Sequence, residues 1–307
     1  MKMAVKRGKH MLYETHYKEG KKINFKKMDL SIAGLLFLPE NFDGNKKYPA
    51  VVVTHPGGGV KEQCSSLYAW NLARNGFVAL AFDASHQGES EGLPRYLEDP
   101  ASRVEDIRSA VDYLTTLSYV DENKIGAMGI CAGAGYTMNA IQTDSRIKAA
   151  AGISTWDVGN SAREGFPGVN IPNFMQKLLR EVAEARTRQA RGGDPEYWNY
   201  VPKSESDINE NTSVIQREAY EYYRTERSRI LLGSITKAAR EHLAHLPPEW
   251  TQCNLWLKSR ATLRLRILTF QPKKRNLLCA LNANVSPADS PYAIWRKHSC
   301  IWSATSL

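Results

Sequence analysis

A cysteine stands among small residues in the stretch "GICAGAGY", residues 129 to 136. The spacing Gly129-x-Cys131-x-Gly133 matches the nucleophile-elbow pattern G-x-S-x-G, with cysteine in place of serine. Small neighbours are needed because the chain turns sharply from strand to helix and holds the nucleophile in a strained conformation. Such a thiol could attack a carbonyl carbon, and we expect the helix behind it to lower the thiol pKa. The alternative is a tight turn in which cysteine is only a small buried residue.

A glycine-rich stretch, "HPGGGVKEQ" at residues 55–63, could supply the second part of such a site. Acyl transfer needs two backbone N–H donors for the oxyanion, one from the residue after the nucleophile and one from an earlier loop. Ala132 would supply the first donor and Gly57 or Gly58 the second. We expect His55 to orient this loop rather than to act as the general base. The alternatives are a packing turn or a phosphate cradle, but no Lys-Ser/Thr pair follows the glycines as a P-loop requires.

The elements around these motifs alternate between strand and helix, which is the α/β pattern. Buried strands are predicted at "AVVVTH", "FVALAFD", "KIGAMGI" and "IKAAAGIS". A helix over "SSLYAWNLARNG" should end at Gly76, and "RVEDIRSAVDYLTTL" has the apolar spacing of a second helix. The oxyanion loop and the elbow therefore both follow strands and precede helices.

These motifs together resemble the α/β-hydrolase superfamily, and most closely its dienelactone-hydrolase-like branch, whose nucleophile is often cysteine. The resemblance covers about residues 20–223 and includes the loop "AFDASHQGESEG". It implies an α/β-hydrolase fold, with a mostly parallel sheet flanked by helices and a helical cap. It also implies that the acid and the base lie elsewhere in the chain, so we interpret Asp83 as a turn-forming residue and His86 as a structural or rim residue.

Three regions are predicted from the change in pattern along the chain. Residues 1–155 form the hydrolase core, and residues 156–223 form a helical cap whose helix presents one face through Phe174, Leu178, Val182 and Ala185, followed by irregular sequence. Its alternative is an ordinary pair of surface helices. Residues 224–307 are atypical, with 14 Lys and Arg against 4 Asp and Glu in a chain of net charge +9. The last strands of the sheet are expected to be missing or irregular.

The catalytic acid and base implied by the resemblance are hard to place in this last region. Asp289 and His298 have the expected order after Cys131, and Glu249 is a second candidate acid. Only nine positions separate Asp289 from His298, which is too short for the helix and strand expected between them. We hypothesise that the reading frame changes near residue 224; the rival hypothesis is a genuine, divergent C-terminal third.

The sequence predicts a hydrolase that acts on an ester, lactone or thioester carbonyl of a small molecule through Cys131. The alternative is a catalytically impaired, hydrolase-like binding protein, since the acid and histidine of a triad are not recognisable.

No metal or organic cofactor is implied, and no membrane partner. A nucleic-acid module in the basic, tryptophan-containing tail is the third interpretation, but the tail matches no nucleic-acid fold, so no nucleic acid is predicted. Five irregularly spaced cysteines favour free thiols and a cytoplasmic protein. The sequence does not indicate an oligomeric state.

Overall fold

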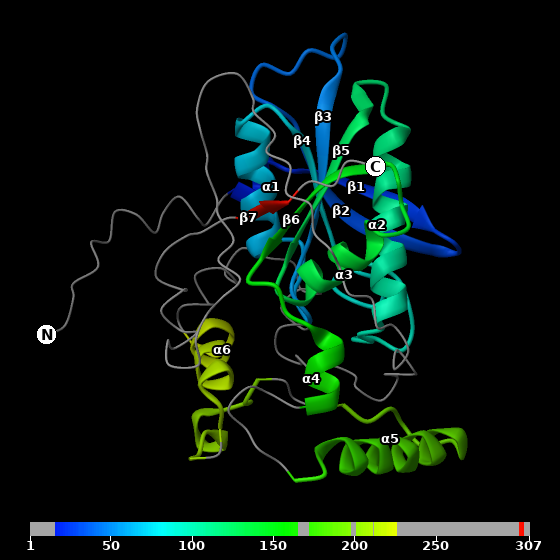
Figure 1. The fold of residues 1–307 in the computed structure, drawn as a ribbon, viewed down its shortest axis with the longest axis vertical. Coiled ribbons are helices and arrows are strands. Elements are labelled where there is room, and N and C mark those ends of the chain that lie inside the picture. The colour runs from blue at the N-terminus through cyan, green and yellow to red at the C-terminus, as the bar shows by residue number, and fades with distance from the viewer. Residues whose placement is uncertain (1–15, 165–171, 198–200, 211, 226–300, 304–307) are drawn as a thin grey trace, which may run out of the picture.

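The computed structural model describes residues 16–164, 172–197, 201–210, 212–225 and 301–303. Its centre is one seven-stranded sheet with the strand order β1-β2-β4-β3-β5-β6-β7 (Figure 1). The strands are β1 (Lys21–Lys27), β2 (Leu30–Phe37), β3 (Tyr48–Thr54), β4 (Val78–Phe82), β5 (Val120–Ile130), β6 (Ile147–Ile153) and β7 (Ile301–Ser303). The central strands β4, β3, β5 and β6 are parallel, as predicted, whereas the pairs at the two edges are antiparallel.

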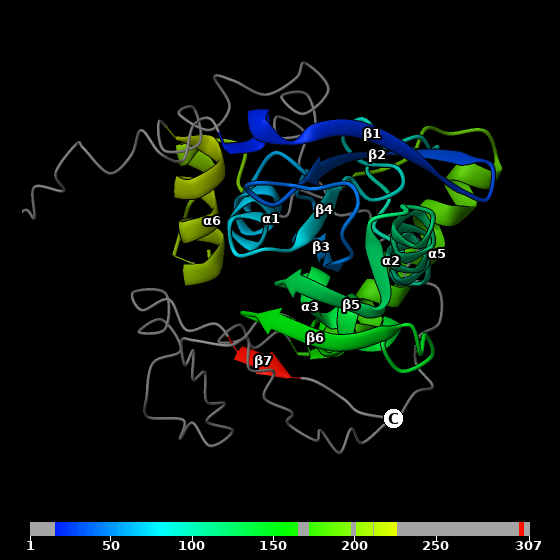
Figure 2. The ribbon, with the colours of Figure 1, turned by 90° about the horizontal axis from the view of Figure 1, so that it is seen from above.

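Helices cover both faces of this sheet (Figure 2). The helical elements are η2 (His16–Glu19), α1 (Cys64–Arg74), α2 (Pro100–Thr115), α3 (Ala132–Ala140), α4 (Val158–Glu164), α5 (Phe174–Ala190), η3 (Glu205–Asp207) and α6 (Val214–Arg224). Helix α1 ends before Gly76, whose φ of 92° is a left-handed conformation suited to glycine. Helix α2 begins at Asp99, whose carboxylate accepts hydrogen bonds from the N–H groups of Ala101 and Ser102.

The two faces of the sheet bury two separate apolar clusters. Helices α2 and α3 cover one face through Val104, Ile107, Val111 and Tyr136, among others. Helix α1 covers the other face through Ala69, Leu72 and Ala73, which pack against side chains of β2, β3, β4, β5 and β6. Because each strand buries side chains on both faces, the central strands are almost continuously apolar, which is why they are recognisable in the sequence.

Helices α4, α5 and α6 all lie toward one end of the sheet (Figure 1). Helix α4 starts shortly after Ile153, the last residue of β6, so this is the end at which the parallel strands finish. In α5 only Leu178 and Ala185 are buried. The expectation of irregular sequence after α5 was wrong for residues 214–224. The hydroxyl of Ser213 and the side chain of Gln216 form a capping box that starts α6 there.

Val60 of the glycine-rich loop packs against the part of the chain that follows β6. Val60 and Val201 are fully buried together, and Tyr220 and Tyr223 of α6 pack on them. The sequence segment after β6 therefore contacts the loop that we expect to stabilise an oxyanion.

The chain beyond residue 225 is described only at β7. Backbone hydrogen bonds join this short strand to β6, with Ala151 opposite Trp302. Glu249, Asp289 and His298 lie outside the described residues. The hypothesis of a changed reading frame stays a prediction.

A buried ion pair fixes the edge strand β1 to helix α2. The ammonium group of Lys27 lies 2.8 Å from Asp106 Oδ1, and it donates a hydrogen bond of 2.7 Å to the hydroxyl of Ser85. Ser85 in turn donates to the same carboxylate. Both charged side chains are almost completely buried, so neither can exchange its partner for water.

We expect Lys27→Met to lower the free energy of unfolding by about 3 to 5 kcal/mol, because Asp106 is left as an unpaired buried charge. Lys26→Met is the matched control, since Lys26 is the exposed neighbour on the same strand, and its change should stay within about 0.5 kcal/mol. Urea denaturation of both variants measures the difference. Equal effects of the two substitutions would contradict the proposed anchoring.

Candidate active site

Cys131 occupies the turn between β5 and α3 in a strained conformation. Its φ and ψ angles are 56° and −121°, in a region that residues with a side chain rarely adopt. Its N–H donates to the carbonyl of Ile153 on the neighbouring strand, and its own carbonyl accepts from Ala134 and Trp156. The main chain is therefore held on both sides, and the surrounding structure maintains the strained angles.

The two glycines of the motif are required by close contacts between main-chain segments. A Cβ atom on Gly129 would lie 2.3 Å from the carbonyl oxygen of Gly133. A Cβ atom on Gly133 would lie 2.4 Å from the carbonyl oxygen of His55. Neither gap can hold a methyl group, so only glycine lets β5 turn into α3 while α3 touches the start of the glycine-rich loop.

The glycine-rich loop lies against the elbow. A Cβ atom on Gly57 would be 3.5 Å from that of Ala132, which is an ordinary van der Waals contact. Gly58 has a φ of 66°, a conformation that suits glycine. The main chain after β3 and the first residue of α3 are thus neighbours, as a pair of oxyanion donors would require.

His55 is used to hold this loop. Its Nε2 accepts a hydrogen bond from the N–H of Ala84, so its proton is on Nδ1, which donates to the carbonyl of Pro56 at 2.6 Å. The ring is fully buried. With both nitrogens occupied in this way, His55 is placed to orient the loop and not to accept a proton from the thiol.

Arg103 of α2 contacts both the glycine-rich loop and helix α3, which follows the elbow. Its guanidinium donates to the carbonyl of His55 at 2.7 Å and lies over the ring of Tyr136, 5.1 Å from its centroid. It also lies 3.4 Å from a carboxylate oxygen of Glu98. The side chain of Arg103 is buried, so this carboxylate is needed to balance its charge.

Glu98 connects four segments around the thiol. Its carboxylate accepts hydrogen bonds from Gln87 at 2.6 Å and from the hydroxyl of Tyr136 at 3.0 Å. The N–H of Gly58 also points to it, at 3.5 Å. Sequence reasoning missed Glu98, Arg103 and Tyr136. The only signal for Glu98 is its position immediately before the Asp-Pro pair that begins α2.

The pKa of the Cys131 thiol is raised, which corrects the expectation of a lowered value. Burial is the largest cause, because it penalises the thiolate, and the negative charge of Glu98 acts in the same direction. A hydrogen bond from the N–H of Ala132 and the positive charge of Arg103 oppose the rise without cancelling it. The helix N-terminus stabilises the thiolate. Burial destabilises the thiolate by more, so the pKa of the thiol rises.

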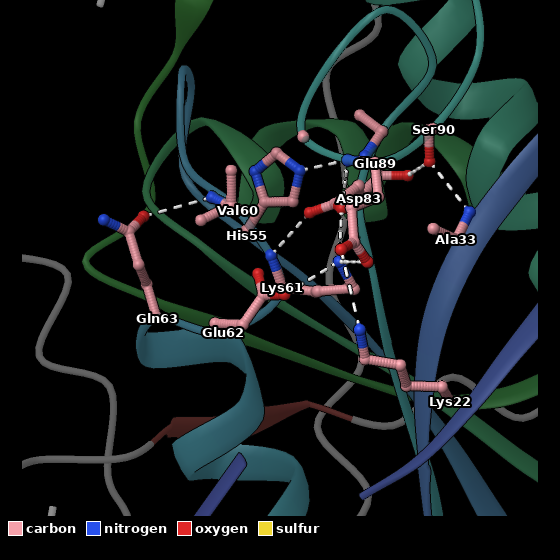
Figure 3. Close-up of polar contacts among 12 residues, drawn as sticks. Lys22, Ala33, His55, Val60, Lys61, Glu62, Gln63, Asp83, Glu89 and Ser90 are labelled. Atoms are coloured by element: carbon pink, nitrogen blue, oxygen red, sulfur yellow. Dashed lines mark hydrogen bonds and ion pairs between the residues drawn. The ribbon is translucent and has the colours of Figure 1, made fainter. Parts of the chain in front are cut away.

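A cluster of buried charges fixes the far end of the loop (Figure 3). The ammonium group of Lys61 lies 2.7 Å from Asp83, 2.9 Å from Glu62 and 2.8 Å from Glu89. Asp83 also accepts from the main-chain N–H groups of Lys61 and Glu89. Asp83 therefore does more than form a turn, because it ties the loop after β3 to the loop after β4.

The charge balance of this cluster explains the state of Glu62. Three carboxylates surround Lys61, and Lys22 lies 3.6 Å from Glu89. Burial and the charge of Asp83 raise the pKa of Glu62 to about 7, against the opposing effect of Lys61. Among the described residues, Oε2 of Glu62 has no hydrogen-bond partner.

The other candidates from the sequence are placed as follows. His86 has a φ of 70°, and its Nδ1 lies 3.0 Å from the carbonyl oxygen of Pro94. Its pKa is lowered, mainly by burial. It belongs to the loop between β4 and α2, in which a Cβ atom on Gly92 would meet its ring at 2.6 Å. Asp289 and His298 lie outside the described residues.

Comparison with known proteins supports the resemblance to a hydrolase family. The model of the dienelactone hydrolase family matches residues 32–154, the segment that holds the glycine-rich loop and the elbow. This part of the chain is therefore similar to the dienelactone hydrolase branch of the α/β-hydrolases.

Individual relatives agree with this resemblance. The chain is 47% identical to the uncharacterized protein YcjY of Escherichia coli (strain K12), over 65% of this chain and 64% of the relative. It is 34% identical to the uncharacterized protein PA2218 of Pseudomonas aeruginosa, over 68% of this chain and 55% of the relative. The crystal structure of PA2218 superposes with a TM-score of 0.63 and 27% identity, over 81% of this chain and 78% of that chain.

A more distant relative has a named activity. The chain is 28% identical to the thiohydrolase aneE of Aspergillus aculeatus, over 54% of this chain and 52% of the relative. The chain thus spans between about half and two thirds of the length of the curated relatives that it matches. Within the described residues, no helix has both the length and the apolar character needed to cross a membrane.

We expect Glu62→Gln to change how stability depends on pH. In the folded protein Glu62 keeps its proton up to about pH 7, whereas its ordinary pKa is 4.5. The contribution of Glu62 to the free energy of unfolding is complete below pH 4.5, falls between pH 4.5 and 7, and is lost above pH 7. The variant should match the wild type near pH 4 and be more stable by on the order of 2 to 3 kcal/mol at pH 8.

Urea denaturation at a series of pH values tests this expectation. Glu122→Gln, at an exposed carboxylate, is the control and should leave the pH dependence unchanged. Parallel pH profiles for the wild type and Glu62→Gln would contradict the expectation, because they would mean that the pKa of Glu62 is the same in the folded and the unfolded protein.

We expect Glu98→Gln to make the Cys131 thiol more reactive. The substitution removes a negative charge that raises the thiol pKa and leaves the positive charge of Arg103. Alkylation of Cys131 by iodoacetamide at pH 7 should therefore become several-fold faster, as followed in the tryptic peptide 125–146. Glu105→Gln, on the partly exposed part of α2, should not change the rate. A slower reaction in Glu98→Gln would contradict the electrostatic role of Glu98.

Proposed function

We propose that this chain hydrolyses or transfers an acyl group from an ester, lactone or thioester through a covalent intermediate on Cys131. The observation that carries the proposal is the strained turn at Cys131 against which the loop of Gly57 and Gly58 is packed. A thiol at the start of a helix, next to a second run of main-chain N–H groups, is the arrangement that acyl transfer needs.

The reaction proceeds in two stages. The thiolate of Cys131 attacks the carbonyl carbon, and the N–H groups of Ala132 and of Gly57 or Gly58 stabilise the oxyanion of the tetrahedral intermediate. The intermediate collapses with loss of the alcohol or thiol and leaves an acyl-enzyme. Water or another nucleophile then attacks the acyl carbon and releases Cys131. The N–H of Gly58 is directed at Glu98 in this structure, so Gly58 would exchange that partner for the oxyanion.

The raised pKa of Cys131 makes a proton acceptor necessary for the first stage. We propose His298 as this base and Asp289 as its orienting acid, since they have the chain order expected of the superfamily. His55 is not suited to the task, because its nitrogens hold the loop.

A thioester is the favoured acyl donor. A thiolate and a thioester exchange with little change in bond energy, and the relative named a thiohydrolase supports this choice. Helices α4 to α6 are proposed as a cap that covers the acyl group, because α6 packs on Val60 of the oxyanion loop.

We expect rapid acylation of the wild type by an activated acyl thioester, with the added mass on tryptic peptide 125–146. Cys131→Ala should lose both the adduct and turnover, by about a thousandfold or more. Cys64→Ala is the control, since it removes the other thiol that the structure describes and leaves the proposed nucleophile. Intact-protein mass spectrometry and thiol release measure the two stages.

A variant at His298 separates the stages. His298→Ala should slow the reaction at least tenfold and make the acyl-enzyme accumulate, because water is no longer activated. Acylation of Cys131 no faster than that of free cysteine would favour the alternative, a hydrolase-like binding protein.

A further inference from the structure

A second thiol lies at the same end of the sheet as the proposed nucleophile. Cys64 is the first residue of α1, directly after the glycine-rich loop, and Cys131 precedes α3. The strands that lead to them, β3 and β5, are adjacent and parallel, with Thr54 opposite Gly129 at their carboxyl ends. Both cysteines are partly buried, and both are free thiols.

The two side chains pack on the same face of the sheet. Helix α3 covers the face opposite to α1, yet the Cys131 side chain packs against the α1 cluster, together with Cys64. That cluster includes Val53, Met128 and Ile130 from the ends of the two strands. The turn at Cys131 thus places its side chain on the face of the sheet that α1 covers, at the end where α1 begins.

The charge of one thiol also affects the ionisation of the other. Burial, the largest cause, and the negative charge of ionised Cys131 together raise the pKa of Cys64 to about 12. Cys131 therefore loses its proton first, while Cys64 remains a thiol. An oxidant that reacts with thiolates will attack Cys131 before Cys64.

We propose that Cys64 is the resolving partner of Cys131, so that a hydroperoxide converts the pair into an internal disulfide. In the first step the Cys131 thiolate attacks a peroxide oxygen, the O–O bond breaks, and sulfenic acid and water or an alcohol are formed. In the second step the sulfur of Cys64 attacks the sulfenic sulfur, water leaves, and an S–S bond forms. One peroxide is reduced for two thiols oxidised, and a dithiol reverses the change.

This pair would protect the site as well as block it. The disulfide joins the start of α1 to the elbow and removes the thiolate from acyl chemistry. It also stops oxidation at a reversible stage, because sulfenic acid is consumed before it becomes sulfinic acid. The formation of the bond does not depend on the acylation of Cys131, so the two proposals stand or fall separately.

Peptide mapping without reduction tests the pairing in the full chain. The five cysteines fall in five different tryptic peptides, and Cys64 and Cys131 lie in residues 62–74 and 125–146. After one equivalent of hydrogen peroxide we expect these two peptides to be joined, with loss of the alkylation of Cys131. Dithiothreitol should restore both thiols. Acylation of the reduced protein, measured in parallel, reports on the proposed function alone.

Variants decide whether Cys64 has the resolving role. In Cys64→Ser and Cys64→Ala, Cys131 sulfinic acid should be several-fold more abundant at equal peroxide, and dithiothreitol should not recover it. Cys253→Ser is the matched control, which removes one of the other thiols and should behave as the wild type. The proposal is overturned if the joined peptide is absent from the oxidised wild type. Joining of Cys131 to another cysteine, or equal sulfinic acid with and without Cys64, would overturn it as well.

Discussion

The close approach of three main-chain segments at the end of β5 is the constraint on which the rest of the site depends. A Cβ atom on Gly129 or on Gly133 would lie less than 2.5 Å from a main-chain oxygen, so the strand, the helix and the glycine-rich loop can meet only at glycines. This contact holds Cys131 at a positive φ and brings Gly57 against Ala132. The nucleophile and both proposed oxyanion donors are thus positioned by one packing arrangement.

Buried charges hold the loop in this position from both ends. Arg103 binds the carbonyl of His55 where the loop begins, and Lys61 binds Asp83 where it approaches α1. Both cations are buried, and each is balanced by a carboxylate, Arg103 by Glu98 and Lys61 by Asp83. Moving the loop away would separate these groups from their partners, so the loop has few alternative conformations. This explains why polar residues such as Lys61 lie in the interior of a site whose chemistry uses main-chain groups.

The electrostatics of the thiol follow from the same enclosure. Burial raises the pKa of Cys131, and Glu98 adds to the rise while balancing Arg103. A dry site strengthens the oxyanion hydrogen bonds that act in the transition state, but it also keeps the resting thiol protonated. The proposed reaction therefore needs a base in addition to the helix N-terminus, and the neighbouring Cys64 is even less ionised.

The sequence by itself determined the fold class, the central strands and the position of the elbow. Continuous apolar runs mark strands that are buried on both faces, and the spacing of Gly129, Cys131 and Gly133 marks the sharp turn from strand to helix. The contact that excludes a side chain at Gly133, with the carbonyl of His55, comes from a distant segment. It did not determine the antiparallel edges, helix α6, the direction of the thiol pKa shift, or the roles of Glu98, Arg103 and Lys61. Those depend on side chains from distant segments that only the tertiary structure brings together. A pKa shift in particular is the difference between burial and several opposing charges, and no local pattern in the sequence encodes that difference.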